Sequence, residues 1–446
     1  MKIYLDTVGC RLNQSEIETY ARQFHVAGHV LVSGAAEADV VVLNTCAVTT
    51  EAASDSRQKI RQAARSGAEG IVVTGCWSTL HPQDAAALSG VRRVVSNADK
   101  DRLVADVLGI PVEQFALEPV ERIAVPGLRL RTRAFIKAQD GCDNRCAFCV
   151  TTVARGAGRS RSIPDVLADI NAAAQSGVQE IVLTGVHLGS WGHDFAVPRH
   201  LADLVQAVLQ ETDVPRVRLS SLEPWDLSPN FFALWQNPRL CRHLHLPLQS
   251  GCAATLKRMA RKTTPESFAA LVAAARAAIP EVAITTDIIV GFPGESDEEF
   301  AASAAFVRQM DFADGHVFSY SARPGTAAAR MKPQVPHPLR KARNAELRQV
   351  LAESAVRYRA HFAGCELPVL WESATALGPG GWELSGLTDN YLRVSATAAQ
   401  DYWNQVTPVS LTGMAPGGLT GVLNAPVPPV SVRNDTFTGQ NGTKTG

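Results

Sequence analysis

Short apolar runs alternate with helical patterns through most of this chain, and this alternation limits the folds open to it. In the first third, the helical patterns separate apolar runs at 2–6, 39–43 and 70–74. Strand–helix alternation predicts a parallel sheet with helices packed against it. We therefore expect residues 1–115 to form a doubly wound α/β domain, whose first helix begins at Ser15 with Glu18 in a capping box.

A second strand–helix series follows a stretch rich in Pro and charge at 111–126, which we interpret as a linker. Helical patterns separate most of its expected strands, which lie at 134–138, 181–184, 217–219, 243–246, 282–289 and 314–318. Six such units predict an open or partial (βα)6 barrel over 128–362.

The pattern changes again at Cys365. Short apolar strands are interrupted there by Gly- and Asn-rich turns, with the strands at 369–371, 382–384, 391–394 and 409–411. They predict a small antiparallel β-barrel over 365–424. Residues 425–446 contain Pro, Thr, Gly and Asn without an apolar pattern, so we expect a disordered tail.

The chain has nine cysteines among 446 residues, an odd number spread too widely for a small disulfide scaffold. Reduced thiols in a long chain are typical of the cytoplasm, where they serve metals or catalysis. The charged residues among the first twenty, Asp6, Arg11, Glu16 and Glu18, argue against a signal peptide. No run approaches 18 apolar residues, so we expect a cytoplasmic protein without a membrane partner.

Three of the cysteines, Cys142, Cys146 and Cys149, form the loop cysteine group in the segment DGCDNRCAFCV. Three thiolates so close together can ligate three irons of a cubane cluster, which leaves the fourth iron open to a small molecule. The loop directly follows the first barrel strand, at the face where barrel enzymes place their chemistry. The alternative is a zinc site completed by His187 or His193.

Three others, Cys10, Cys46 and Cys76, form the N-terminal cysteine group, and each directly follows an expected strand. Ligands of open parallel sheets bind beyond the carboxyl ends of the strands, so we predict a second metal site at this sheet edge. The spread of these thiols also fits a second cluster with an open iron. The alternative is that each packs as an ordinary buried thiol, because free Cys behaves as a small hydrophobe.

The loop pattern C-x-x-x-C-x-aromatic-C, with Phe148 as the aromatic, resembles the radical S-adenosylmethionine (SAM) superfamily. Together, the two cysteine groups resemble the methylthiotransferase family of radical SAM enzymes, and the resemblance covers about residues 1–424. It is carried by GCRLNQSE (9–16), NTCAVT (44–49), TGC (74–76), ARGAGRSRS (154–162), LTGVHLGSWG (183–192), LSSLEP (219–224), HLHLPLQSG (243–251), DIIVGFPGE (287–295) and FSYSARPGT (318–326). GLTDNYLRV (386–394) and LTGMAPGGLTGVL (411–423) resemble its terminal β-barrel module, called TRAM. Thr151 and Thr152 depart from an Ile-Pro pair that many members have.

The resemblance implies two [4Fe-4S] clusters, with SAM on the open iron of the loop group and the sulfur to be inserted on that of the N-terminal group. A radical made from SAM then abstracts hydrogen from carbon 2 of the adenine beside the tRNA anticodon, and a second SAM methylates the inserted sulfur. The candidate SAM contacts are Phe148, Gly185 and Glu223. The implied partners are tRNA and an electron donor such as flavodoxin or ferredoxin, and we expect a monomer.

The motif GCRLNQSE, with Arg11 after the cysteine and then Asn13-Gln14, resembles that of the branch that acts on N6-threonylcarbamoyladenosine in tRNA. The isopentenyladenosine branch typically reads Gln-Met-Asn there, and the ribosomal-protein branch reads Pro-Lys-Asn. The alternatives are therefore methylthiolation of isopentenyladenosine or of a ribosomal-protein aspartate. A third, from another class, is a non-catalytic iron–sulfur protein that binds RNA.

Charge is balanced overall, with 43 basic and 43 acidic residues, but it is unevenly placed. Residues 129–161 hold eight basic and two acidic residues around the loop group, so we expect Arg155, Arg159 and Arg161 to contact RNA. The terminal barrel has only Arg393 against five acidic residues, which does not suit a module that grips phosphate. That acidity is the main argument for a protein substrate.

Overall fold

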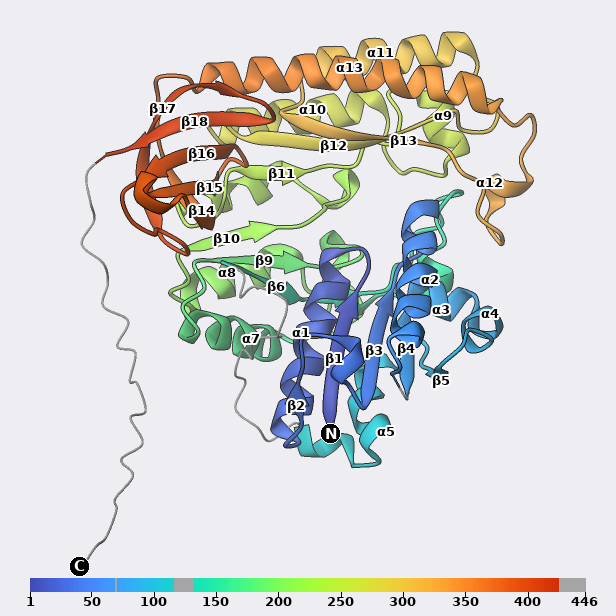
Figure 1. The fold of residues 1–446 in the computed structure, drawn as a ribbon. Helices are drawn as coiled ribbons and strands as arrows, with labels where there is room; N and C mark the ends of the chain where they lie inside the picture. Colours follow the sequence, from blue (N-terminus) through green and yellow to red (C-terminus); the bar gives the residue numbers. More distant parts are fainter. Residues whose placement is uncertain (69, 116–131, 425–446) are drawn as a thin grey trace, which may run out of the picture.

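The computed structural model of the chain describes residues 1–68, 70–115 and 132–424 (Figure 1). The expected tail and most of the expected linker lie outside the described residues. No described helix has the length and apolar character needed to cross a bilayer.

The N-terminal part is a five-stranded sheet in which every strand pair is parallel. Its order is β2 (Val30–Leu31), β1 (Lys2–Thr7), β3 (Val40–Thr45), β4 (Ile71–Gly75) and β5 (Val91–Val94). The three central strands are those expected from the sequence, whereas β2 and β5 were missed because they are short edge strands.

Helices cover both faces of this sheet, because alternate residues of a strand point to opposite sides. On one face, Ile17 and Phe24 of α1 (Arg11–Val26) pack with Val42 and Val72, next to α5 (Leu103–Leu108). On the other face lie α2 (Thr50–Arg65), α3 (Cys76–Leu80) and α4 (Pro82–Ala86). The doubly wound α/β class is confirmed.

The first helix does not begin where the sequence suggested. Helix α1 starts at Arg11 with Cys10 as its N-cap, and Ser15 is buried within it. The Asn13 side chain donates to the carbonyls of Val8, at 2.8 Å, and Thr45, at 3.2 Å. The expected start at Ser15 is wrong because the helix already begins at Arg11, which leaves Ser15 buried inside its first turns.

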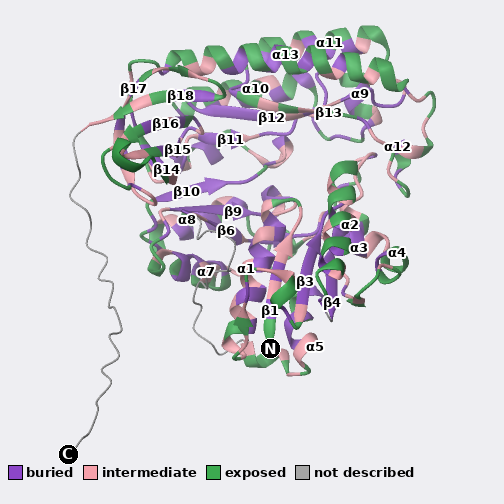
Figure 2. Cartoon of the chain, viewed as in Figure 1, coloured by how far each residue is buried: buried purple, intermediate pink, exposed green. Residues whose placement is uncertain are grey.

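The middle part holds all six expected strands, arranged as two parallel three-stranded sheets. One contains β6 (Arg133–Lys137), β9 (Glu180–Thr184) and β10 (Arg216–Leu219), and the other β11 (His243–His245), β12 (Ala283–Val290) and β13 (Asp314–Ser319). Isolated bridges, Val217–Leu240 and Ser221–His245, join β10 to the second sheet, so the two form one partial barrel. The main outer helices are α7 (Ile163–Gln175), α8 (Leu201–Glu211), α10 (Pro265–Ala278), α11 (Asp297–Met310) and α13 (His337–His361). Figure 2 shows that the strands are mostly buried and that α11 and α13 keep exposed outer faces.

The terminal part is a closed five-stranded barrel, as expected. Its order is β14 (Glu366–Ala376), β15 (Trp382–Thr388), β16 (Arg393–Ala398), β18 (Gly418–Leu423) and β17 (Val406–Ala415). All pairs are antiparallel except β16–β18. The sequence missed β18, and it placed Tyr391 in a strand although this residue lies in a turn with φ +68°.

The three parts contact one another directly. Helix α1 packs against β6, and α3 packs against α6 (Thr151–Arg155), which follows the loop cysteine group. In Figure 1 the terminal barrel lies at upper left, beside the N-terminal ends of the strands of the partial barrel and away from α2, α3 and α4. The fold therefore brings the N-terminal sheet edge and the loop cysteine group to one side of the partial barrel.

Candidate metal centres

The N-terminal cysteine group lies at the carboxyl ends of three adjacent strands, β1, β3 and β4. Cys10 is exposed, Cys46 and Cys76 are buried, and all three are free thiols. Burial raises the pKa of the Cys46 thiol to about 11, and the nearby Cys10 and Cys76 add to the shift. The structure therefore brings the three side chains of this group together at one sheet edge.

Glycines before two of these cysteines make that approach possible. Gly9 has φ +105°, and a Cβ there would lie 2.5 Å from Sγ of Cys46. Gly75 has φ +96°, and a Cβ there would lie 2.2 Å from the carbonyl oxygen of Thr45. Both conformations are ones that residues with side chains rarely adopt, so the turns ending β1 and β4 require glycine.

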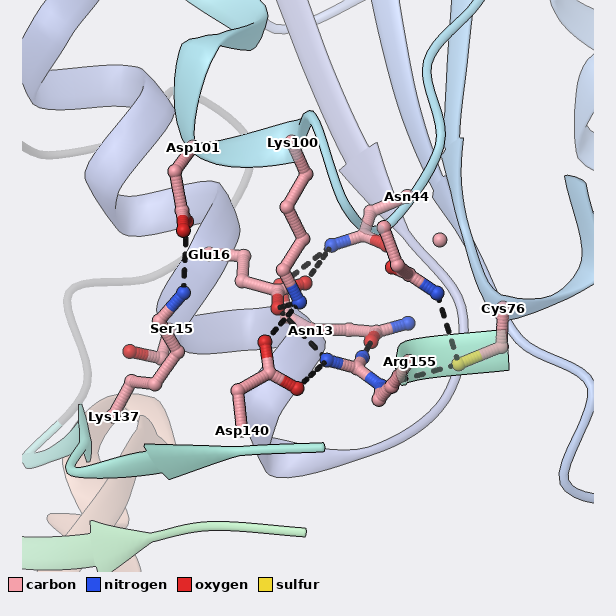
Figure 3. A network of polar contacts seen from close by, with 12 residues as sticks. Asn13, Ser15, Glu16, Asn44, Cys76, Lys100, Asp101, Lys137, Asp140 and Arg155 are labelled. Carbon is pink, nitrogen blue, oxygen red and sulfur yellow. Dashed lines mark hydrogen bonds and ion pairs between the residues drawn. The ribbon is translucent and has the colours of Figure 1, made fainter. Parts of the chain in front are cut away.

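A buried polar network lies beside Cys76 (Figure 3). We use this name for Glu16, Lys100, Asp140 and Arg155, each of which is at least 95% buried. Nε of Arg155 donates to Sγ of Cys76 at 3.2 Å, and Nη1 donates to carboxylate oxygens of Asp140 at 2.9 Å and Glu16 at 3.0 Å. Lys100 pairs with both carboxylates. The network thus crosses from α1 of the N-terminal sheet to the start of the cysteine loop.

Electrostatics keep this network ionised although burial opposes it. Burial alone raises the pKa of Glu16, but Arg155 and Lys100 outweigh it and lower that pKa to about 2. The same two cations hold the pKa of Asp140 well below its usual range, again against burial. Two cations and two carboxylates therefore form a locally neutral buried set.

Arg155 does not lie where an RNA contact would be. It is 3% exposed, and its guanidinium is already paired with carboxylates inside the protein. Our expectation that it meets phosphate needs correction, because a buried and neutralised cation is not presented to a nucleic-acid backbone. Arg159, whose side chain is 47% exposed, is better placed, and Arg161 is partly exposed but pairs with Asp169 at 2.5 Å.

The basic stretch is also less positive in the fold than in the sequence. Arg133 pairs with Glu372 at 2.6 Å, and Lys137 pairs with Asp101 at 3.0 Å. Arg129 and Arg131 lie outside the described residues. Several of the described cations in this stretch therefore hold the three parts of the chain together.

The loop cysteine group follows β7 (Gln139–Asp140), and its three thiols are partly buried and free. The N–H of Thr151 donates to Sγ of Cys149 at 3.3 Å, and its hydroxyl oxygen lies 3.1 Å from the same sulfur. Nη1 of Arg261 lies 3.8 Å from Sγ of Cys146. Each of these two sulfurs thus has a polar neighbour that fixes its position.

The expected SAM contacts lie around this loop in different ways. Glu223 pairs with Arg261 at 2.7 Å, and Arg261 in turn lies next to Cys146, so Glu223 is linked to this cysteine through one side chain. Gly185 packs against Gln139, where a Cβ would come within 3.0 Å of Oε1, so packing alone explains a glycine there. Phe148 packs with an apolar cluster that includes Met259 and Phe292.

The two histidines considered as zinc ligands lie in different places. Nε2 of His187 is 2.5 Å from Asp226, and this carboxylate and Cys142 raise its pKa to about 10, although burial opposes the shift. His193 instead packs its ring against His200. Within the described residues, no three His, Cys, Asp or Glu side chains lie close enough to hold a single metal ion. The ligands of a cubane bind separate irons, so they need not gather around one point.

Sequence reasoning missed several of these neighbours. Arg261, Lys100 and Asn97 carry no motif of their own, and only the fold brings them near the cysteines. Asn97 donates to Sγ of Cys76 at 3.7 Å and to the carbonyl of Ala154 at 2.8 Å. Asn13 and Glu16 lie in the segment GCRLNQSE, which by sequence alone serves only to distinguish the branches of the family. Arg155 lies in ARGAGRSRS, where the sequence alone indicated an RNA contact.

Comparison with known proteins agrees with this arrangement. Residues 2–96 match the model described as "Uncharacterized protein family UPF0004", and residues 136–307 match that of the "Radical SAM superfamily". The radical SAM methyltransferase TsrM from Kitasatospora setae has a similar fold, with a TM-score of 0.55 and 16% identity. That alignment covers 74% of this chain and 75% of TsrM.

Two curated relatives are similar over nearly the whole chain. Threonylcarbamoyladenosine tRNA methylthiotransferase MtaB of Bacillus subtilis is 34% identical, covering 91% of this chain and 92% of that protein. The tRNA-2-methylthio-N(6)-dimethylallyladenosine synthase of Cereibacter sphaeroides is also 34% identical, covering 94% of this chain and 98% of that protein. With its doubly wound sheet, partial barrel and closed terminal barrel, the chain belongs to the radical SAM methylthiotransferase family.

Proposed function

We propose that this enzyme methylthiolates carbon 2 of N6-threonylcarbamoyladenosine next to the anticodon of tRNA, using SAM and two [4Fe-4S] clusters. The observation that carries the proposal is that one buried polar network contacts Cys76 of one group of three free cysteines and Asp140, two residues before the other group. In our proposal, the loop group holds the SAM-binding cluster, and the N-terminal group holds the cluster that carries the sulfur.

Both groups suit such clusters by the chemistry of their donors. Thiolates are the usual ligands of iron–sulfur clusters, and three of them leave one iron without a protein ligand. Bound at these sites, the clusters and SAM supply the one-electron and sulfur chemistry that an unreactive aromatic C–H requires. The chain itself supplies the thiolates and the groups that hold them in position.

The neighbouring side chains have supporting roles in this proposal. Thr151 and Arg261 orient the sulfurs of Cys149 and Cys146 by hydrogen bonding. The pair of Glu223 and Arg261 borders the loop, where Glu223 is our candidate for a SAM contact. Trp225 lies against Arg261, with its ring centroid 4.4 Å from the guanidinium carbon, in a cation–π contact that helps to position this arginine.

The threonylcarbamoyl branch is supported by two features. The segment GCRLNQSE resembles the motif of that branch, and the Bacillus subtilis relative is named for this nucleoside. The relative from Cereibacter sphaeroides is equally similar and is named for dimethylallyladenosine, which makes that nucleoside the second candidate. Identity alone therefore does not choose the substrate, and our choice depends on the residues around Cys10.

Expression in a bacterial strain that lacks its own methylthiotransferases tests the substrate. Mass spectrometry of tRNA nucleosides should show methylthio-threonylcarbamoyladenosine with the wild-type chain and none with Cys146→Ala. A methylthio group found only on dimethylallyladenosine would move the chain to the other branch. Unmodified tRNA together with a methylthiolated ribosomal-protein aspartate would replace the tRNA proposal altogether.

Anaerobic reconstitution tests the number of clusters. Two cubanes correspond to about eight irons per chain, whereas a single cluster gives about four. The wild-type chain should also form 5′-deoxyadenosine from SAM, and a non-catalytic iron–sulfur protein would form none. We place the enzyme in the cytoplasm as a monomer that is reduced by a donor such as flavodoxin or ferredoxin.

A further inference from the structure

We propose that Arg155 is a positioning residue for the N-terminal cysteine group, whose N–H···S bond to Cys76 raises the reduction potential of the cluster held there. This inference rests on the proposed function, because it needs a second cluster. It assigns Arg155 a role inside the protein in place of the RNA contact expected from the sequence.

All three nitrogens of the guanidinium are engaged. Nε faces Cys76, Nη1 faces Glu16 and Asp140, and Nη2 donates to Oδ1 of Asn13 at 2.7 Å. A guanidinium is planar, with its donors in a fixed fork. The contacts of Nη1 and Nη2 therefore determine where the Nε–H bond points, and they aim it at the sulfur of Cys76.

The burial of this contact increases its effect. Arg155 is 3% exposed and Cys76 is 7% exposed, so little water competes for the Nε–H···S hydrogen bond. Reduction adds negative charge to a cluster, and a hydrogen bond donated to a ligand sulfur favours the reduced form. Asn97 is the other described side chain that donates to this sulfur, and its donor is neutral and more distant, at 3.7 Å.

The same guanidinium also contacts the segment that leads into the loop cysteine group. Asp140, which accepts from Nη1, lies two residues before Cys142. Figure 3 shows Arg155 between Asp140 on one side and Cys76 on the other. Arg155 therefore also fixes the N-terminal sheet edge against the start of the cysteine loop.

The test isolates the N-terminal group in the full-length chain. Cys142, Cys146 and Cys149 are all replaced by Ala, and Arg155→Gln or Arg155→Lys is added to this parent. After anaerobic reconstitution, iron per chain is counted, and a redox titration followed by electron paramagnetic resonance gives the potential. Arg155→Gln should shift the potential to more negative values, and Arg155→Lys should give a smaller shift because it keeps the charge without the Nε–H bond.

The matched control is Arg22→Gln, which removes an ion pair between α1 and Asp169 of α7 without touching a cysteine. It should leave the potential unchanged, so a shift like that of Arg155→Gln would overturn the inference by showing a general interface effect. If the Arg155 variants hold iron at the parent's potential, the inference is also wrong. If Arg155→Gln does not fold, Arg155→Lys decides by the same criterion. A parent that binds no iron instead contradicts the second cluster of the proposed function.

Discussion

The hydroxyl of Tyr391, in the terminal barrel, accepts a hydrogen bond from Nη2 of Arg11 at 3.1 Å, and Arg11 directly follows Cys10. The ring of Tyr391 stacks on His243 of the partial barrel, with centroids 4.1 Å apart and planes 6° from parallel. The guanidinium carbon of Arg218 lies 5.2 Å from the same ring. One tyrosine thus joins all three parts of the chain beside a cysteine of the N-terminal group.

Replacing Tyr391 should loosen that junction in two steps. Tyr391→Phe removes the hydrogen bond to Arg11 but keeps the stacking, so we expect a loss of about 1 kcal/mol of stability. Tyr391→Ala also removes the ring from His243 and Arg218, and should cost about 3 kcal/mol. Thermal unfolding of the metal-free chain measures both. Equal effects of the two variants would show that the ring contributes nothing beyond its hydroxyl.

The acidity of the terminal barrel is explained in part by its contacts with the rest of the chain. Asp389 pairs with Arg242 at 2.7 Å, and Glu372 pairs with Arg133 at 2.6 Å. Two of its five acidic residues therefore bind arginines of the partial barrel. For these two residues a protein substrate is not needed to explain the acidity, because they serve docking within the chain.

The double variant Glu372→Gln and Asp389→Asn should detach the terminal barrel more readily. Each of these ion pairs is partly buried, and removing its acidic partner breaks the contact between the two barrels, while Arg242 keeps Glu281 and Arg133 keeps Glu180 as partners inside the partial barrel. Limited proteolysis should cut faster in the connection between α13 and β14. The control is Glu383→Gln, since Glu383 is exposed on β15. Equal cleavage rates in the two variants would contradict a docking role for these pairs.

The sequence predicted the parts that depend on local pattern. The expected strands of the first two parts lie within one or two residues of their predicted bounds, because apolar runs and cysteines that follow strands are local features. Contacts that depend on tertiary packing could not be predicted. Ser15 has the sequence pattern of a helix cap, and only the packing of α1 against neighbouring elements shows that this residue is buried inside the helix. Arg155 looked like an RNA contact because its neighbours in the buried network, Glu16 and Lys100, are distant from it in sequence.

Thr151 should tune the loop cluster as Arg155 tunes the other. Its hydroxyl and its N–H both face Sγ of Cys149, and hydrogen bonds to ligand sulfurs raise the potential of a cluster. Thr151→Val keeps the N–H and the shape but removes the hydroxyl, so we expect a more negative potential. The titration is done in a chain in which Cys10, Cys46 and Cys76 are Ala. Thr152→Val is the control, since its hydroxyl binds the carbonyl of Asn144 and no sulfur.

The depressed pKa of Glu16 predicts a specific acid sensitivity. Because its pKa falls from 4.5 to about 2 on folding, its stabilising contribution is complete above pH 4.5 and is lost as the pH falls toward 2. Glu16→Gln should cost about 3 kcal/mol at neutral pH, since it breaks a buried ion pair. Urea unfolding of the metal-free chain at pH 7 and pH 3 measures both effects.

When the pH is lowered from 7 to 3, Glu16→Gln should lose less stability than the wild-type chain, because it lacks the titrating carboxyl. The control is Glu37→Gln, which alters an exposed carboxylate in the same part of the chain and should follow the wild-type dependence. A wild-type dependence in Glu16→Gln as well would show that other carboxyls cause the acid sensitivity.

Gly75 should be essential for the N-terminal cluster. A Cβ at this position would meet the carbonyl of Thr45 at 2.2 Å and Oδ1 of Asn44 at 2.5 Å, so Gly75→Ala must displace the turn that leads to Cys76. We expect the variant to bind about half the iron of the wild-type chain after reconstitution, because only the loop cluster then forms. Gly67→Ala is the matched control, since Gly67 also has a left-handed φ, of +85°, but a Cβ there would meet no described atom within 4 Å. If Gly75→Ala binds as much iron as Gly67→Ala, the contact with Thr45 does not control cluster binding, and the role assigned to Gly75 is wrong.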